Sequence, residues 1–335
     1  MNSTIKNIAK LCNVSHTTVS RAINGSPLIK EKTKSRILEA AVQLNYVPNL
    51  NAKSLVLQKS YNIGLFFSTL GQGTSSDFFH QTVEGVNRII GREYNLVVSG
   101  IDDYSDFYTI NIKRFDGILL ISQSDSDDPF IKYILNEGIP LVVLNRETEL
   151  YPVINIVAAE SMGAYNAALY LIKCGHRSSA IIEGLSGFKS SENRKAGFFK
   201  ALNDNEIKIN NDFIVKGRYN IESGYEAMKQ LLLLKKRPTA VFCSNDEMAV
   251  GAIKAIQDVG LIVPRDISII GFDDSMVCSY ITPELSSVRK PTNEISTRGA
   301  RRLLSLIRER TKQSERIYID TELILRKSVS DPPNY

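Results

Sequence analysis

The chain has 335 residues, of which 43% are hydrophobic and 23% charged, and its formal net charge is +5. This length allows two or three domains, and the composition is that of an ordinary soluble globular protein. No apolar run has transmembrane length, and no charged-then-apolar signal peptide begins the chain, so we expect a cytoplasmic protein without a membrane partner. The four cysteines and three histidines are widely scattered, which favours free thiols and gives no support to a metal site.

The spacing of apolar residues predicts three short helices at the start of the chain, at 4–12, 16–24 and 30–44. A tight turn at 13–15 joins the first two, and the Ser15 hydroxyl is the expected N-cap of the second helix. The residues that share one small core are Ile5, Ile8, Ala9, Cys12, Val19, Ile23, Ile37, Ala40, Ala41 and Leu44. This arrangement is typical of a helix-turn-helix, whose second helix enters a DNA major groove.

The outer face of the second helix carries polar side chains that suit base edges and phosphates, namely His16, Thr17, Ser20 and Arg21. Residues 1–60 contain nine Lys or Arg and two Glu, so this segment carries +7 and the remainder −2. Basic charge concentrated in one segment is expected of a surface that faces phosphates. The alternative is an ordinary solvated three-helix bundle, but turn, cap, charge and polar face together favour DNA binding.

Between residues 45 and 60 the sequence allows two interpretations. Pro48 disfavours helical backbone at Val47 and predicts a break there. The stretch 49–57 can form a helix but is too short and polar to be stable alone. It is either a segment that orders on DNA, with Leu55 as a minor-groove wedge, or a plain linker, and the residues alone favour neither.

From residue 62 onward, apolar strands alternate with amphipathic helices. The expected strands are 63–67, 96–98, 115–121, 140–144, 179–182, 213–215, 239–243 and 267–270. The expected helices are 78–90, 161–174, 193–203, 221–234 and 246–259. Near-continuous apolar strands predict parallel sheets covered on both faces, and two successive series predict two similar lobes. A ligand is expected in the cleft beyond the carboxyl ends of the strands.

Five motifs carry a resemblance to a known family, and they are Thr18–Gly25, Tyr46–Leu55, Arg194–Phe198, Asn245–Gly251 and Asp266–Asp274. With them the chain resembles the lactose-repressor (LacI/GalR) family of bacterial transcription regulators over its full length. The resemblance implies an α/β fold class. An N-terminal all-α helix-turn-helix domain and a hinge precede a two-lobed α/β core with parallel sheets, which is like a periplasmic binding protein and crosses between its lobes three times.

The resemblance also implies domain boundaries. The DNA-binding domain is expected at 1–47, the hinge helix and linker at 48–60, and the effector-binding core at 61–335. The N-lobe is expected to comprise 61–158 and 290–320, and the C-lobe 159–289 and 321–331.

Eleven DNA-binding residues are expected: Thr4, Ser15, His16, Thr17, Thr18, Ser20, Arg21, Asn24, Asn49, Ala52 and Leu55. By the resemblance, His16, Thr17 and Arg21 match positions that contact DNA, and Ala52 and Leu55 match hinge residues that enter the minor groove, which favours the wedge over the plain linker. Six effector-binding residues are expected: Phe78, Asn145, Arg194, Tyr219, Asn245 and Asp273. By the resemblance, Arg194, Asn245 and Asp273 match effector contacts, and Tyr219 lies where some members place an aromatic ring. Phe78 and Asn145 are candidates from their place, at the start of a cleft-side helix and in a loop after a strand.

These effector-binding side chains suit a polyhydroxylated ligand. The guanidinium of Arg194 can donate paired hydrogen bonds to a diol, the carboxylate of Asp273 can accept two hydroxyl protons, and Asn245 can do both. Alternatives remain open: Arg194 and Asp273 could form a structural salt bridge, Tyr219 could be a packing residue, and Phe78 could lie in the lobe core.

The sequence departs from the family pattern at two positions near the cleft. Ala159 stands where the family commonly has an aspartate, and Asn145-Arg146 replaces the common Asp-Arg. Both departures leave room for a ligand other than the common hexoses.

We therefore predict a repressor of carbohydrate-utilisation genes, which binds a palindromic double-stranded DNA operator as a homodimer and is controlled by a sugar-like effector between the lobes. No cofactor or metal is expected. The chain has neither a phosphate-loop motif nor a G-x-S-x-G elbow, so no enzyme activity is expected. Two alternatives remain: a family regulator controlled by a nucleobase or a protein partner, and a non-regulatory sugar-binding protein. The sequence does not reveal the effector, its direction of control, the operator or the target genes.

Overall fold

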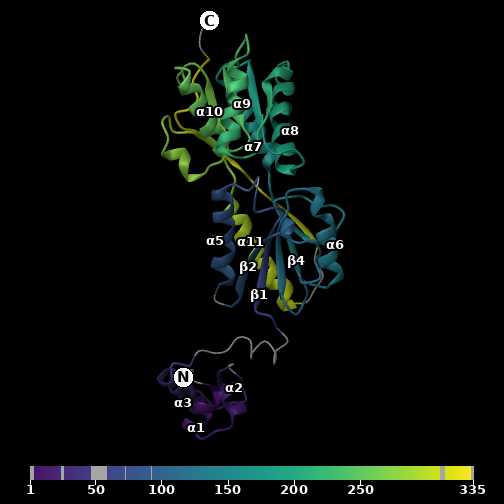
Figure 1. The fold of residues 1–335 in the computed structure, drawn as a ribbon, viewed down its shortest axis with the longest axis vertical. Helices are drawn as coiled ribbons and strands as arrows, with labels where there is room; N and C mark the ends of the chain where they lie inside the picture. The colour runs from purple at the N-terminus through teal and green to yellow at the C-terminus, as the bar shows by residue number, and fades with distance from the viewer. Residues whose placement is uncertain are drawn as a thin grey trace. The chain divides into compact units, whose positions relative to one another are not determined.

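The computed structural model describes residues 4–23, 26–46, 59–71, 73–91, 93–309 and 314–332. The chain divides into two compact units, residues 1–59 and 60–335 (Figure 1). Among the described residues, no helix is both long and apolar enough to cross a membrane.

The first unit is a bundle of three short helices, α1 (Ile5–Leu11), α2 (His16–Ile23) and α3 (Glu31–Gln43). Its core contains Ile8, Val19 and Ile37, each fully buried, as the apolar spacing predicts. Asn13 has a φ of 48° in the turn between α1 and α2, a left-handed conformation that asparagine tolerates. The Ser15 hydroxyl accepts a hydrogen bond from the backbone N–H of Thr18 at 3.1 Å, as expected of an N-cap.

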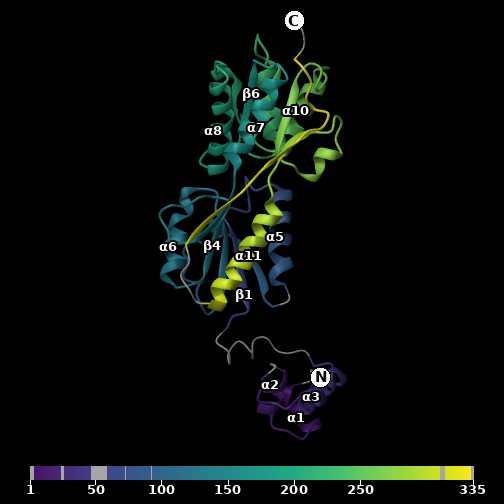
Figure 2. The ribbon, with the colours of Figure 1, turned by 180° about the vertical axis from the view of Figure 1, so that it is seen from behind.

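The second unit contains two α/β lobes, each built on a six-stranded sheet (Figures 1 and 2). The N-lobe sheet has the order β11-β5-β4-β3-β1-β2, and all its strands are parallel. These strands are β1 (Asn62–Phe67), β2 (Asn95–Gly100), β3 (Gly117–Ile121), β4 (Leu141–Leu144), β5 (Ile154–Ala158) and β11 (Glu315–Ile319).

Helices cover both faces of the N-lobe sheet. Helices α5 (Ser76–Ile90) and α11 (Thr292–Glu309) lie side by side on one face, and α6 (Asp128–Asn136) lies on the other (Figure 2). The strands alternate accordingly: Leu65 faces the core under α5 and α11, whereas Phe66 faces the core beside α6. Both side chains are fully buried, as a sheet covered on both faces requires.

The C-lobe sheet has the order β12-β10-β9-β8-β6-β7. Its strands are β6 (Ser179–Glu183), β7 (Ile214–Lys216), β8 (Ala240–Cys243), β9 (Ser268–Asp273), β10 (Ser286–Arg289) and β12 (Glu322–Ile324). The sheet is parallel except for β12, which pairs antiparallel with β10. Helices α7 (Glu160–Lys173) and α8 (Lys189–Asp204) cover one face, and α9 (Ile221–Leu232) and α10 (Asp246–Asp258) cover the other.

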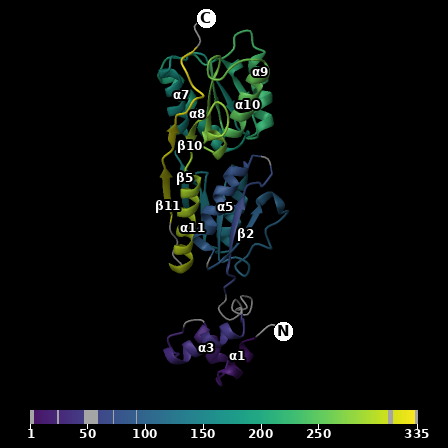
Figure 3. The ribbon, with the colours of Figure 1, turned by 90° about the vertical axis from the view of Figure 1, so that its left-hand side faces the viewer.

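The chain passes between the lobes three times, after β5, after β10 and after β11 (Figure 3). The late segment with α11 and β11 returns to the N-lobe, and β12 then completes the C-lobe sheet, as the family resemblance implies. The apolar pattern did not predict α6 or β5. Each is short, at nine and five residues, and β5 lies close after β4, so neither stands out as a separate periodic run.

Candidate functional site

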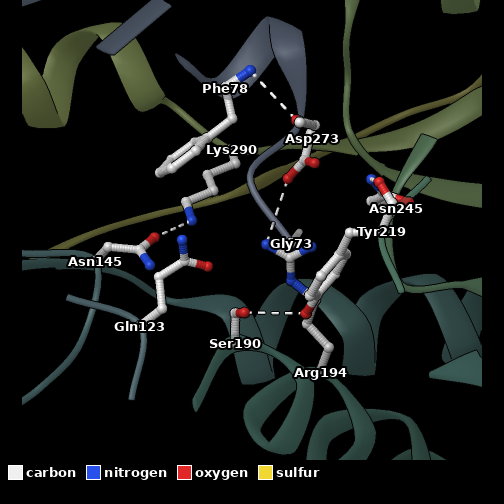
Figure 4. A pocket seen from close by; sticks show the side chains of 11 residues that line it. Gly73, Phe78, Gln123, Asn145, Ser190, Arg194, Tyr219, Asn245, Asp273 and Lys290 are labelled. Atoms are coloured by element: carbon white, nitrogen blue, oxygen red, sulfur yellow. Dashed lines mark hydrogen bonds and ion pairs between the residues drawn. The ribbon is translucent and has the colours of Figure 1, made fainter. Parts of the chain in front are cut away.

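A pocket of about 330 Å³, partly open to solvent, lies where the carboxyl ends of the two sheets meet (Figure 4). Its lining residues are Gly73, Ser75, Phe78, Gln123, Asn145, Ser190, Arg194, Tyr219, Asn245, Asp273 and Lys290. All six side chains that the sequence assigned to the effector are therefore around one pocket. Among the described residues, no group of acidic, cysteine and histidine side chains could hold a metal ion.

Arg194, from the first turns of α8, is the most constrained side chain of the pocket. Its guanidinium donates hydrogen bonds to the Ser244 carbonyl, to Glu160 Oε1 at 2.8 Å and to Asp273 Oδ1 at 3.3 Å. It also lies over the Phe272 ring, 3.8 Å from the ring centroid. Burial opposes the positive charge, but the two carboxylates more than offset it and raise the pKa of Arg194.

Glu160 and Lys290, which the sequence did not predict, hold this cation in an ionic network. Glu160 Oε1 accepts hydrogen bonds from both Arg194 and Lys290 Nζ, each at 2.8 Å, and all three side chains are buried. Burial opposes ionisation of Glu160, but the two cations lower its pKa to about 2. Lys290 Nζ also donates to the amide oxygen of Asn145. The network thus connects Glu160 and Lys290, each in a segment that crosses between the lobes, to Arg194 and Asn145 in the pocket wall.

The strand ends at the pocket have unusual backbone geometry. Asn145, Tyr219 and Asp273 have φ angles of 74°, 63° and 104°, a region that non-glycine residues rarely adopt. Each such conformation costs on the order of 1–3 kcal/mol and is concentrated at functional sites in proteins. Burial raises the pKa of Asp273, against the opposing effect of Arg194 and Lys290. Its carboxylate nevertheless faces the pocket, where a hydroxyl donor would relieve its desolvation (Figure 4).

Tyr219 combines pocket lining with packing. Its ring stacks on Phe188 at a centroid distance of 6.2 Å, and its hydroxyl lies 3.0 Å from Ser190 Oγ. Gly184 makes this position possible, because a Cβ there would lie 2.2 Å from the tyrosine hydroxyl. Burial raises the pKa of Tyr219 to about 12, so its hydroxyl stays protonated at neutral pH. Both interpretations of this residue, ligand wall and packing tyrosine, therefore describe part of its environment.

Asn245 positions its neighbours. Its amide oxygen accepts a hydrogen bond from the backbone N–H of Met248 at 3.0 Å, and so caps α10. Its amide nitrogen donates to the Tyr219 carbonyl at 3.1 Å, and the residue is only 1% exposed. Two of its hydrogen bonds are thus already used within the protein, which leaves fewer for a ligand than the sequence suggested.

Phe78 lies at the boundary between pocket and core. It lines the pocket, with Lys290 Nζ 5.0 Å from its ring centroid, and also packs edge-on against Phe67 in the N-lobe core. The neighbouring Phe79 packs with Phe67 as well, at 5.4 Å between ring centroids. Both roles that the sequence suggested for Phe78, pocket lining and packing in the lobe core, are therefore observed.

Of the two positions that depart from the family pattern, Asn145 lines the pocket and Ala159 does not. Asn145 lines the pocket, but Arg146 lies behind it and forms ion pairs with Asp125 at 2.8 Å and Asp128 at 2.6 Å. Ala159 is the N-cap residue of α7 and is not a lining residue. A buried acid stands one position later, at Glu160. Glu160 could have been identified from the sequence as an acidic residue that closely follows an apolar strand, at the point where the chain crosses between the lobes.

The described DNA-binding candidates lie mainly on the surface of the first unit. Thr4, Ser15, His16, Thr17 and Arg21 are exposed, and Thr18 and Ser20 are half-buried. Thr4 is also the N-cap residue of α1, and its backbone N–H donates to the Asn7 side chain at 3.0 Å. The remaining candidates, Asn24, Asn49, Ala52 and Leu55, lie outside the described residues.

Each of the two units matches a known protein family. A sequence model described as "Bacterial regulatory proteins, lacI family" matches residues 4–49, and one described as "Periplasmic binding protein-like domain" matches residues 168–329. A Bacillus subtilis (strain 168) protein named "Probable HTH-type transcriptional repressor ExuR" is 54% identical over 326 residues. The alignment covers 97% of this chain and 98% of that relative.

Two similar solved structures are regulators with a bound ligand. The lac repressor dimer, bound to operator and the anti-inducer ONPF, has a TM-score of 0.85 at 26% identity. A complex of the transcriptional regulator CelR with cellobiose has a TM-score of 0.74 at 28% identity. Each similarity covers 98% of this chain and 100% of the other chain.

Proposed function

The chain belongs to the lacI family of bacterial regulatory proteins, and from that premise we propose that it represses carbohydrate-utilisation genes under the control of a sugar or sugar derivative. It is a DNA-binding transcriptional repressor regulated by a small-molecule effector, like its relatives. The observation that carries the sugar proposal is the polar pocket between the lobes, which is lined by the acceptor Asp273 and by the donors Arg194 and Lys290.

The pocket favours a neutral polyhydroxylated ligand that is bound and not converted. Asp273 is the principal acceptor for hydroxyl protons, and Gln123, Asn145 and Ser190 add side chains that can donate or accept. The positive charges of Arg194 and Lys290 are balanced by Glu160 and Asp273, so the cluster has no formal net charge. Aromatic rings at Phe78 and Tyr219 supply apolar surface for the C–H faces of a sugar.

We further propose a cytoplasmic homodimer that reads a palindromic operator, because a two-fold axis in the protein matches one in the DNA. Residues 1–47 would form the DNA-binding domain, with His16, Thr17 and Arg21 on the reading face of α2. Residues 48–60 would form the hinge, with Ala52 and Leu55 in the minor groove. The lac repressor, solved as a dimer on its operator, supports this arrangement by similarity.

The test is operator binding in the presence of sugars. Fluorescent palindromic DNA from upstream of the gene is titrated with the purified protein, and mono- and disaccharides are added one at a time. We expect one sugar to change operator affinity by about 5- to 150-fold, a coupling of about 1–3 kcal/mol. Tight binding without any sugar response would contradict the carbohydrate proposal and favour a nucleobase or a protein partner.

A further inference from the structure

The N-lobe supplies a hydrogen-bond acceptor to the first N–H group of a helix in the C-lobe. Lys189 begins α8 in the C-lobe, and its backbone N–H donates to the carbonyl of Gln123 in the N-lobe at 2.9 Å. The start of α8 is therefore capped from across the pocket.

Two side-chain contacts accompany this hydrogen bond. Lys189 Nζ forms an ion pair with Asp125 of the N-lobe at 3.0 Å. Phe188, the N-cap residue of α8, packs against Gly73, where a Cβ would lie 2.7 Å from the phenyl ring. Gly73 has a φ of 93°, so both its backbone and its missing side chain permit this close approach.

The start of α8 depends on the N-lobe for a hydrogen-bond acceptor. The first N–H groups of a helix have no acceptor within the helix. Phe188 has no side-chain oxygen to supply one, and α8 has no side-chain cap bond. Separation of the lobes would return the Lys189 N–H group to water.

We propose that these three contacts, Lys189–Gln123, Lys189–Asp125 and Phe188–Gly73, form an interlobe latch that favours the closed lobes before effector binds. The latch makes Lys189 and Asp125 positioning residues for the effector response, in a way that rests on the proposed function. If the pocket is complete only when closed, apparent effector affinity scales with the closed fraction. The latch thereby sets effector sensitivity without touching the effector.

The latch is tested without any ligand, by hydrogen exchange at single-residue resolution on the full chain. The helix ladder does not protect its own first N–H groups, so protection at Lys189 reports the Gln123 acceptor in the other lobe. We expect Asp125→Asn, in the N-lobe, to speed exchange several-fold at the Lys189 N–H, in the C-lobe. Asp128→Asn is the matched control, because Asp125 and Asp128 both pair with Arg146, and Asp125 also pairs with Lys189.

A second variant tests the latch from the other side and guards against misfolding of the first. Lys189→Met removes the ion pair with Asp125 from the C-lobe side and should speed exchange at the backbone N–H of residue 189. Lys200→Met removes an ion pair within α8, with Asp204 at 2.6 Å, and should leave that exchange unchanged. Unchanged exchange at residue 189 in Asp125→Asn would overturn the latch, because the N-lobe substitution would then have no effect on the C-lobe. Because no effector is used, this result is independent of the operator and sugar titration.

Discussion

At the scale of single residues, Glu160 is the side chain on which the pocket most depends. It is the counter-ion for both Arg194 and Lys290, and it is 3% exposed. We expect Glu160→Gln to lower the free energy of unfolding by about 3–5 kcal/mol, because it leaves two buried cations without their shared carboxylate. Chemical denaturation measures this. The control is Glu226→Gln, which removes an exposed ion pair with Lys229 and should change little.

A substitution at Asp273 should show whether this residue binds effector or only pairs with Arg194. Its carboxylate faces the pocket and has one ion pair with Arg194, at 3.3 Å. We expect Asp273→Asn to weaken effector binding by about 1.5–3 kcal/mol, the cost of a lost charge-assisted hydrogen bond. Isothermal titration with the responsive sugar checks this. Unchanged effector affinity, with normal operator binding, would mean that the residue only pairs with Arg194.

Asp246 should make the stability of the core depend on pH. Burial, with the nearby Asp273 charge, raises its pKa to about 7, although hydrogen bonds from Ser287 and Ser275 oppose the rise. A carboxyl group whose pKa is higher in the folded state keeps its proton there while the unfolded chain loses it. Its contribution to stability is therefore greatest at low pH and is lost as pH rises from about 4 to 7.

Asp246→Asn tests this assignment, because the amide stays neutral at every pH. The free energy of unfolding of wild type, minus that of the variant, should fall as pH rises from 5 to 7. Denaturation at several pH values, with both proteins in the same buffers, measures the difference. A difference that stays constant with pH would show that Asp246 is ionised throughout.

At the scale of elements, α2 is the expected reading helix. His16, Thr17 and Arg21 are exposed along it, whereas Val19 is buried. We expect Arg21→Ala to weaken binding to the cognate operator by about 1–3 kcal/mol and to affect unrelated DNA less. Lys10→Ala, which removes an exposed cation of α1, is the matched control and should weaken both DNAs similarly. Equal losses for the two variants on both DNAs would contradict base reading by α2.

The elements show which parts of the fold a sequence can predict. Strands such as β1 and β8 are runs of apolar residues between turns, so both series of the core were evident from the sequence. The antiparallel pairing of β12 was not, because three residues carry no direction. Of the six predicted effector residues, Arg194, Asn245 and Asp273 came from matching motifs. Glu160 and Lys290 did not, because their contact joins positions 130 residues apart and no local pattern records it.

At the scale of the whole molecule, the arrangement of the two lobes should link the pocket to the operator. The lobes meet at the pocket, and the chain passes between them three times, so a ligand there can change how the lobes lie. The N-lobe receives the chain from the DNA-binding unit, since β1 is its first strand. Effector and operator binding should therefore be coupled through the arrangement of the lobes.

The most direct measurement is the affinity of the responsive sugar with and without saturating operator. Coupling between two binding sites is reciprocal, so a sugar that changes operator affinity by a given factor must have its own affinity changed by operator by the same factor. Calorimetry on the full chain measures both affinities. We expect equal factors, in the range of about 5- to 150-fold. Sugar binding that is identical with and without operator would contradict control of DNA binding from this pocket.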